Sequence, residues 1–391
     1  MPWKETCTMD QKMRFIADWL SGEFSKSELC RVYGISRPTG DKWIARYEAL
    51  GPRGLEEWSR APHHCPHATP QAVADRIIEA KGLHRSWGPK KVMDHLRKTE
   101  PEMCWPADST AGAILKRAGL VQPRRRRRGA PASEPFGECQ AANDTWSIDF
   151  KGHFALGSGQ RCHPLTMSDN QTRFILQCRG LSRTGYRQVQ PWVEQTLREY
   201  GLPRAMRSDN GAPFASTALG GLTRLSVWLV RLGIRPERIT PGRPDQNGRH
   251  ERMHRTLNEA GVHPIQATMT AQQRQFDAFV DEYNYLRSHE ALGRQTPGSV
   301  YRPSPRPFPR RLPPVEYEEG VVVRHVRHNG EIKWRGHRLY VSQTLAQEPV
   351  ALEQIDNHLW KLRFSFHLLG YLDERKMTIS PPKCKSRRKR V

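Results

Sequence analysis

The chain has no paired cysteines, no long apolar run and no apolar N-terminus. Its eight cysteines include no Cys-x-x-Cys pair, and their scattered spacing predicts reduced thiols in a cytosol. No stretch of about 18 apolar residues occurs, so we expect no membrane span and no membrane partner. The first residues, Met-Pro-Trp-Lys-Glu, do not resemble a signal peptide. A cytoplasmic protein is therefore the expectation.

Acidic residues are few relative to basic ones. The 391 residues include 63 Lys and Arg but only 40 Asp and Glu, which gives a formal net charge of +23 and a pI of about 10.1. A field of this sign favours a polyanionic partner. The length predicts more than one domain, and a hydrophobic share of 37% is low without being that of a disordered chain.

One carboxylate stands among many cations in residues 240–258, where a Pro/Gly loop runs into a predicted helix. Glu251 lies about one turn into that helix and is flanked by Arg249, Arg252 and Arg255. Surface ion pairs contribute only about 0–1 kcal/mol, so stability alone does not account for this arrangement. The arrangement is explained if Glu251 holds a metal ion beside nucleic-acid phosphates, because the arginines then bind the phosphates while the carboxylate binds the cation. A solvated helix face is the alternative for the arginines.

Two further acids stand at strand-like positions. Asp149 lies in an alternating stretch, Thr-Trp-Ser-Ile-Asp-Phe-Lys-Gly, which places it on one strand face with Ser147 and Lys151. Asp209 follows a short predicted strand and precedes a Gly/Pro turn, a position suited to open on a cleft. Three hard oxygen ligands suit Mg²⁺ or Mn²⁺. Four neighbouring residues are expected to shape the turns and are candidates to touch DNA: Asn210, Gly211, Asn247 and Gly248.

These motifs resemble a known family. Ser-Asp-Asn-Gly-x-Pro-Phe at 208–214, then Pro-Gly-x-Pro-x-Gln-Asn-Gly-x-x-Glu-x-x-x-x-Thr-Leu at 241–257, looks like the core of bacterial insertion-sequence transposases of the retroviral-integrase superfamily. Trp-Ser-Ile-Asp-Phe-Lys-Gly at 146–152 resembles the segment with the family's first acid. The resemblance covers roughly residues 140–300. It implies a ribonuclease-H-like core with an Asp-Asp-Glu triad, here Asp149, Asp209 and Glu251.

The spacing of the second and third acids departs from that of many relatives. Forty-one residues separate Asp209 from Glu251, whereas Asp245 would satisfy the shorter spacing common in the family. Asp245 lies in the Pro/Gly loop before the helix, while the local motif places the Glu after Asn-Gly, so we assign the role to Glu251. Asp169 lies between two predicted strands, where it either caps a turn or reaches the cleft.

The resemblance implies DNA transposition by two-metal phosphoryl transfer. Asp149 and Asp209 would bind two Mg²⁺ or Mn²⁺ ions per active site, with Asp149 bridging them and Glu251 completing the second site. The protein would bind terminal inverted repeats, cleave the ends of a mobile element and join the freed 3′-OH to target DNA in a bacterial nucleoid. Paired ends imply at least a homodimer on DNA. The candidate phosphate contacts are Lys151, Arg249, Arg252 and Arg255.

Two helical units are predicted before the core. Residues 1–55 have the pattern of a helix-turn-helix domain, with Met13, Ile16, Trp19 and Leu20 marking its first helix. Its third helix would expose Arg37, Thr39 and Lys42 to base edges, although a plain three-helix bundle is the alternative. Residues 70–122 have the pattern of a second helical unit, and the resemblance implies that it also binds DNA.

The remaining segments are predicted as a core, a C-terminal domain and linkers. The core, residues 143–300, reads as three strands followed by alternating helices and strands, which fits a mixed sheet with helices on its faces. Short strands over residues 315–376 fit a small β-barrel. Residues 123–142, which include five consecutive arginines, and residues 301–314, rich in Pro and Arg, read as linkers; residues 377–391 read as a basic tail.

Three rival interpretations remain. His250-Glu251-x-x-His254 matches the zinc-protease pattern, although no third ligand follows at a characteristic spacing. A cluster of three His and one Cys at residues 63–67 is too dense for a regular zinc site and reads better as a solvated linker. A non-catalytic DNA-binding regulator derived from a transposase would keep the helical units, but the intact acids argue against it.

Overall fold

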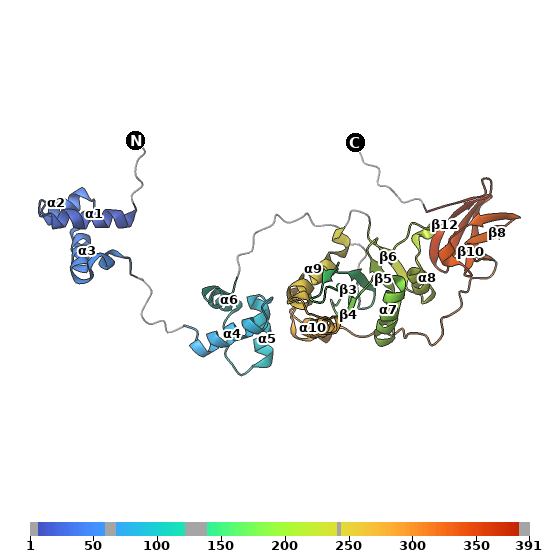
Figure 1. Cartoon of the computed structure of the whole chain (residues 1–391), viewed down its shortest axis with the longest axis horizontal. Helices are drawn as coiled ribbons and strands as arrows, with labels where there is room; N and C mark the ends of the chain where they lie inside the picture. Colours follow the sequence, from blue (N-terminus) through green and yellow to red (C-terminus); the bar gives the residue numbers. More distant parts are fainter. Residues whose placement is uncertain (1–6, 59–67, 122–138, 241–243, 383–391) are drawn as a thin grey trace. The chain divides into compact units, whose positions relative to one another are not determined.

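A computed structural model describes residues 7–58, 68–121, 139–240 and 244–382. It divides into two compact units, Met1–Ala68 and Thr69–Val391 (Figure 1). The His and Cys cluster at 63–67, the arginine run at 124–128 and the basic residues after 382 lie outside the described residues. No helix of the described part combines the length and apolar character needed to cross a bilayer.

The first unit is a helix-turn-helix domain, as predicted. It consists of α1 (Thr8–Leu20), α2 (Lys26–Val32), α3 (Arg37–Leu50) and a 3-10 turn, η1 (Gly51–Leu55). Ser25 caps α2, since its hydroxyl accepts from the Glu28 amide. Met13 and Leu20 are exposed rather than inward-facing, so the prediction for them was wrong. Ile16 is buried as expected and Trp19 packs against the same cluster, while the second buried residue of α1 is Phe15, which was not named.

The second unit begins with three helices that share their own core. They are α4 (Gln71–Leu83), α5 (Pro89–Thr99) and α6 (Asp108–Arg117). Pro89 starts α5, because a missing amide hydrogen costs nothing in the first turn. The fully buried side chains of this bundle include Ile77, Trp87, Val92, Met93, Leu96 and Leu115.

A mixed sheet follows, in agreement with the predicted fold. Its strands are β1 (Thr145–Phe150), β2 (Phe154–Ala155), β3 (Arg161–Asp169), β4 (Ile175–Leu181), β5 (Ala205–Ser208) and β6 (Arg235–Arg238). The order is β2-β3-β1-β5-β6, with β4 paired to β3. β1 runs antiparallel to β3 and parallel to β5, which is itself parallel to β6.

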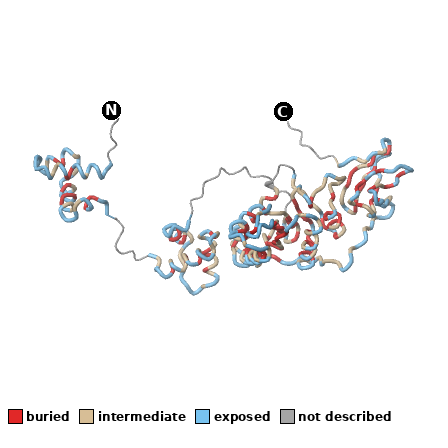
Figure 2. Tube along the Cα trace, viewed as in Figure 1, coloured by how far each residue is buried: buried red, intermediate tan, exposed pale blue. Residues whose placement is uncertain are grey.

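Helices cover both faces of this sheet (Figures 1 and 2). α7 (Tyr186–Tyr200) and α8 (Arg224–Arg231) share one apolar cluster with Trp146 and Ile148 of β1. α9 (Gly248–Leu257) and α10 (Met269–Asp281) share another with Ile175 and Cys178 of β4. Since neighbouring strand residues point to opposite faces, Ser147 and Asp149 lie on the face that α9 covers.

Short turns complete the core. They are η2 (Leu219–Gly221), η3 (Pro244–Asn247), the π-helical η4 (Asn258–Val262) and η5 (Glu282–Leu286), η6 (Glu290–Leu292) and α11 (Pro297–Val300). The predicted Pro/Arg linker then lies along the core, where the backbone carbonyl of Arg306 accepts from the Leu202 amide at 2.7 Å. Tyr301 is buried there, and Phe308 packs on the same cluster as α7.

The C-terminal strands do not form the closed β-barrel that we predicted. β7 (Val322–His325), β10 (Pro349–Asp356), β11 (Leu359–Phe364), β12 (His367–Asp373) and β13 (Thr378–Ser380) form an open sheet with β13 and β7 at its edges. A separate hairpin, β8 (Glu331–Trp334) and β9 (His337–Tyr340), lies next to both edges. η7 (Gln343–Leu345) follows it. The hairpin closes the apolar core through side chains such as Ile332 and Trp334, without a hydrogen-bonded ladder to either edge among the described residues.

Candidate active site

Asp149 lies near the end of β1 on the face covered by α9. It pairs with Thr166 of β3, whose hydroxyl donates to the Asp149 carbonyl at 3.0 Å. The carboxylate is half-buried and accepts from the Phe150 amide at 2.7 Å. The alternating sequence of β1 determines this orientation, because Trp146 and Ile148 occupy the opposite, apolar face.

Asp209 comes directly after β5, beside Asp149. Ile148 is in register with Ser208 in the parallel pair β1–β5, so Asp149 and Asp209 are the next residues along the two strands. The Asp209 carboxylate accepts from the Gly211 amide at 3.1 Å. A Cβ at Gly211 would lie 2.9 Å from Asp209 Oδ2, so a side chain at this position would displace the Asp209 carboxylate. Asn210 donates to the Ile239 carbonyl at 2.9 Å, which ties the turn to the end of β6.

Glu251 lies in the first turn of α9, and its side chain is exposed. The start of the helix is fixed by Asn247, a buried residue whose Oδ1 accepts from the Ser147 hydroxyl at 3.1 Å. Asn247 therefore joins α9 to β1, as a turn-shaping residue. No neighbouring atom restricts a side chain at Gly248.

His250 and His254 point from α9 into the sheet. Both Nε2 atoms contact the Thr166 hydroxyl, at 2.8 and 2.7 Å, and His250 Nδ1 contacts the Ser168 hydroxyl at 2.8 Å. Burial lowers the pKa of His254 to about 4 and that of His250 well below its usual range, with His254 adding to the effect on His250. Two neutral, hydrogen-bonded imidazoles of this kind hold a helix on a sheet. The sequence signal for this packing is the pair of alternating hydroxyl residues on β3, Thr166 and Ser168, together with the His-x-x-x-His spacing in α9.

The zinc-protease interpretation gains no support from this arrangement. Among the described residues, no three His, Cys, Asp or Glu side chains gather tightly enough to form a ready-made metal site. The same observation applies to the three acids, which are not gathered into a closed cluster. Asp169 is a turn cap: its Oδ1 accepts from the Thr172 amide at 2.7 Å and from the Gln171 amide at 3.1 Å.

The three acids nevertheless interact electrostatically. Burial, then the negative charge of Asp209, and more weakly that of Glu251, raise the pKa of Asp149 to about 7, against the opposing hydrogen bond from Phe150. Asp149 and Asp209 follow paired residues of β1 and β5, and α9, which carries Glu251, covers the face to which Asp149 points. A divalent cation would relieve the repulsion, and carboxylate oxygens are its preferred donors. The donor set therefore fits Mg²⁺ or Mn²⁺ in its chemistry.

The raised pKa of Asp149 predicts that the metal-free protein loses stability as the pH rises. The carboxyl has an ordinary value of 3.8 and a folded value of about 7, so between these limits the folded state holds a proton that the unfolded chain has released. The contribution of Asp149 to the free energy of unfolding should fall by on the order of 1 kcal/mol per pH unit across this window and stay level above it. Thermal unfolding in EDTA from pH 4 to 8 measures this. Asp149→Asn should flatten the decline; an equally steep decline in that variant would contradict the assignment.

Cations line the space next to the acids. An open pocket of about 450 Å³ is bounded by Phe150, Lys151, Gly152, Glu251, His254, Arg255 and Asn258. Arg249 projects from another side of α9 and donates to the Asn170 carbonyl at 3.0 Å, while Arg252 is exposed. In the other unit, Arg37 and Lys42 are exposed on α3, and Thr39 is half-buried with its hydroxyl 2.8 Å from that of Ser36.

The core is a mixed sheet with helices on both faces, with Asp149 near the end of β1 and Asp209 directly after β5. Comparison with known proteins identifies its class. Integrase core domain models match residues 140–244 and 232–297, and a helix-turn-helix domain model matches residues 11–63.

Two curated relatives come from insertion elements. An uncharacterized 39.2 kDa protein of element IS476 from Xanthomonas euvesicatoria is 31% identical over 284 residues, covering 70% of this chain and 71% of that protein. An uncharacterized 31.7 kDa protein of element IS407 from Burkholderia multivorans is 27% identical over 279 residues, covering 70% of this chain and 89% of that protein. The chain therefore belongs to the insertion-sequence transposases of the retroviral-integrase superfamily, a family of DNA-integrating proteins with an Asp-Asp-Glu motif.

Solved structures show more distant likenesses. A simian T-cell lymphotropic virus intasome, in complex with a regulatory subunit of PP2A, covers 75% of this chain and 97% of its own at 15% identity, with a TM-score of 0.37. The HTLV-2 integrase catalytic core in complex with magnesium covers 41% of this chain and 97% of its own at 13% identity, with a TM-score of 0.31. The family assignment rests on the family models and the IS476 protein.

Proposed function

We propose that this chain binds the terminal inverted repeats of its own mobile element, cleaves the ends and joins the freed 3′-OH to target DNA. One observation carries the proposal: Asp149 and Asp209 follow residues paired in register on the parallel strands β1 and β5, and the helix that carries Glu251 packs on the face to which Asp149 points. A cation-lined pocket containing Glu251 adjoins them. The carboxylates suit divalent cations, because a bound cation relieves their mutual repulsion. The neighbouring Lys and Arg side chains suit the phosphates of a nucleic acid.

Asp149, Asp209 and Glu251 are the residues that would hold two divalent ions, Mg²⁺ or Mn²⁺. Asp149 neighbours Asp209 through the register of β1 with β5 and lies on the sheet face that α9 covers, so it is the residue that both ions would share. When bound, such ions activate a hydroxyl nucleophile and stabilise the leaving oxygen of an in-line displacement. Glu251 is exposed and stands on a helix, so its side chain is free to turn toward the other two.

Different basic side chains would contact different parts of the bound DNA. Lys151 and Arg255 line the pocket that contains Glu251 and would hold the phosphate next to the cleaved bond. Arg249 and Arg252 would contact phosphates further along the duplex. Arg37, Thr39 and Lys42 begin α3, where a recognition helix reads base edges in the major groove. Since each of two ends needs a site, the active form would be at least a homodimer on DNA.

The test is cleavage by the full chain of DNA that carries the element's ends. We expect nicking with Mg²⁺ or Mn²⁺, none in EDTA, and strand transfer of a pre-cleaved end into a second plasmid. Matched DNA with scrambled ends should be bound less tightly and left uncut. Specific end binding without nicking under any divalent ion would favour the non-catalytic regulator and defeat the enzyme proposal.

A further inference from the structure

One buried cation of the core has no part in the proposed chemistry. Arg207 lies on β5, two residues before Asp209, and is only 5% exposed. Burial of a guanidinium is costly unless the group is paired and hydrogen-bonded. Glu237 of β6 is one partner, since its carboxylate accepts from Arg207 Nη2 at 3.0 Å and from Nε at 3.3 Å. The register explains this pair, because the two residues lie opposite each other in the parallel strands β5 and β6.

Arg207 belongs to a polar row that crosses the sheet beside the acids. Strand pairing aligns it with Ser147 of β1 on one side and with Glu237 of β6 on the other. Ser147 lies two residues before Asp149, so alternation along β1 places the row on the sheet face to which Asp149 points. The row therefore lies on the face that α9 covers.

This row holds the start of the helix that carries Glu251. Arg207 Nη1 donates to the Gln246 carbonyl at 3.5 Å, and the Ser147 hydroxyl donates to Asn247 Oδ1 at 3.1 Å. The first contact is long, but a full charge attracts a carbonyl dipole strongly in a buried site. Gln246 and Asn247 are the last residues of η3, directly before α9. The strands that lead to the other two acids therefore each hold one residue at the entry to α9.

The connection from β6 to α9 is held at its other end by the residue after Asp209. Asn210 Nδ2 donates to the Ile239 carbonyl at 2.9 Å. The Thr240 amide donates to Gln246 Oε1 at 2.7 Å, which joins the two ends of the connection to each other. Asp209 therefore lies between two residues that hold opposite ends of the segment leading to the third acid.

We propose that Arg207 is a positioning residue for catalysis: paired with Glu237, it holds the start of α9 on β5 and so sets the position of Glu251 relative to Asp209. Its role is to hold the acids in place rather than to contact DNA. The inference rests on the proposed function, because it concerns how the acids of that site are brought together. Arg235 offers a matched control, since it bonds the same Glu237 carboxylate at 2.9 Å while its side chain is 65% exposed.

Single-turnover nicking of end DNA by the full chain tests the proposal. Arg207→Met should slow nicking by about 10²-fold at saturating DNA and Mg²⁺, because a small displacement of a reacting group can cost that much. Affinity for the same DNA in EDTA should stay at the wild-type value. Arg207→Lys, which keeps the charge without the fork of donors, should recover part of the rate. Arg235→Met should nick like the wild type; an equal loss there would trace the effect to the charge on Glu237 and overturn the role of Arg207.

Arg207→Met/Glu237→Gln separates positioning from stability. Removing both members of a buried pair leaves no unpaired buried charge, so the double variant should resist urea better than Arg207→Met does. Its nicking should nevertheless stay as slow as that of Arg207→Met. Recovery of the nicking rate together with stability would make Arg207 a purely structural residue and refute the inference.

Hydrogen exchange gives a readout that does not depend on cleavage. In EDTA, amides in the first turns of α9 should exchange several-fold faster in the double variant than in the wild type, while those of α10 should not change. Wild-type exchange in α9 of the double variant would contradict the proposal. A wild-type protein that nicks with no divalent ion would defeat the proposed function alone, because the exchange result still decides whether Arg207 holds α9.

Discussion

Glu251→Gln is expected to abolish Mg²⁺-dependent cleavage of end DNA, whereas Asp245→Asn is expected to leave cleavage near the wild-type rate. Each variant removes one negative charge from the same stretch of chain, so the pair is matched in charge and differs only in position. Glu251 faces the pocket beside Lys151 and Arg255 and adds to the repulsion felt by Asp149. Losing a metal ligand removes several kcal/mol of transition-state stabilisation, which corresponds to a loss of about 10³-fold or more.

The measurement is the nicking rate under single-turnover conditions, together with the affinity for the same DNA. Asp209→Asn should show the same result as Glu251→Gln, with cleavage lost and binding kept. Lys151→Ala should instead weaken binding as well, since it removes a phosphate contact. Loss of cleavage in Asp245→Asn with activity retained in Glu251→Gln would transfer the third role to Asp245 and invalidate our choice between the two spacings.

The catalytic face was predictable because a strand has a strict period of two. Alternation in β1 places Trp146 and Ile148 in the core and sends Asp149 to the other face, which needs no knowledge of the partner elements. The position of Asp209 followed from a short predicted strand that runs into a Gly/Pro turn. The helix-turn-helix domain and the mixed sheet could be predicted for the same reason, because local periodicity determines the helices and strands of both.

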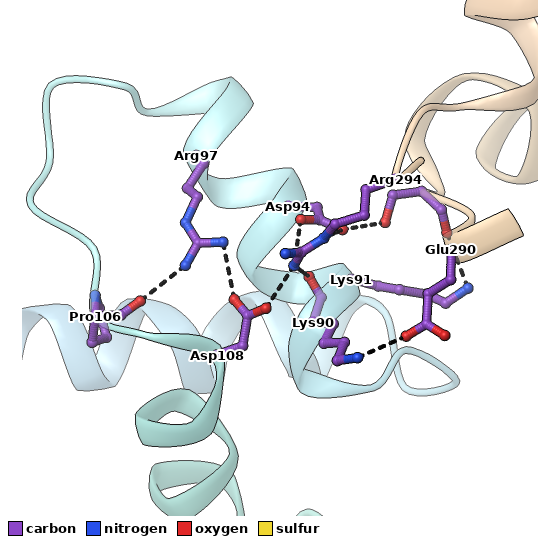
Figure 3. A network of polar contacts seen from close by, with 9 residues as sticks. Lys90, Lys91, Asp94, Arg97, Pro106, Asp108, Glu290 and Arg294 are labelled. Atoms are coloured by element: carbon purple, nitrogen blue, oxygen red, sulfur yellow. Dashed lines mark hydrogen bonds and ion pairs between the residues drawn. The ribbon is translucent and has the colours of Figure 1, made fainter. Parts of the chain in front are cut away.

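Features that depend on long-range packing were not predictable. The C-terminal strands have the alternation of a barrel, but whether their edges pair depends on β8 and β9, which lie beside the edges instead of joining them. The contact between α5 and residues 287–294 joins segments far apart in sequence, so no local pattern brings Asp94 next to Arg294 (Figure 3). Met13 and Leu20 had the right periodicity for burial, but the face of α1 is set by contacts with α2 and α3.

The histidines of α9 show how one pattern supports two chemistries. His-x-x-x-His on a helix suits zinc if both rings face a metal, and it suits packing if both face hydroxyls on a strand. His250 is 1% exposed, and its two ring nitrogens contact Thr166 and Ser168. The contacts with β3 hold α9 in register with β1, and thus hold Glu251 on the side of Asp149. The histidines therefore act as positioning residues for the acid between them.

Replacing His250 by Ala should lower the free energy of unfolding of the core by about 2–4 kcal/mol, because it opens a cavity and removes the ring nitrogen that the buried Ser168 hydroxyl contacts. Urea unfolding of the core transition measures the loss, and the nicking rate should fall with it as α9 shifts. His250→Gln, whose amide can reach Thr166, should recover part of both. His328→Ala, at an exposed turn, should stay within about 0.5 kcal/mol of the wild type. Added zinc should not stabilise the wild type; a zinc-dependent rise in stability that His250→Ala abolishes would make these histidines metal ligands instead.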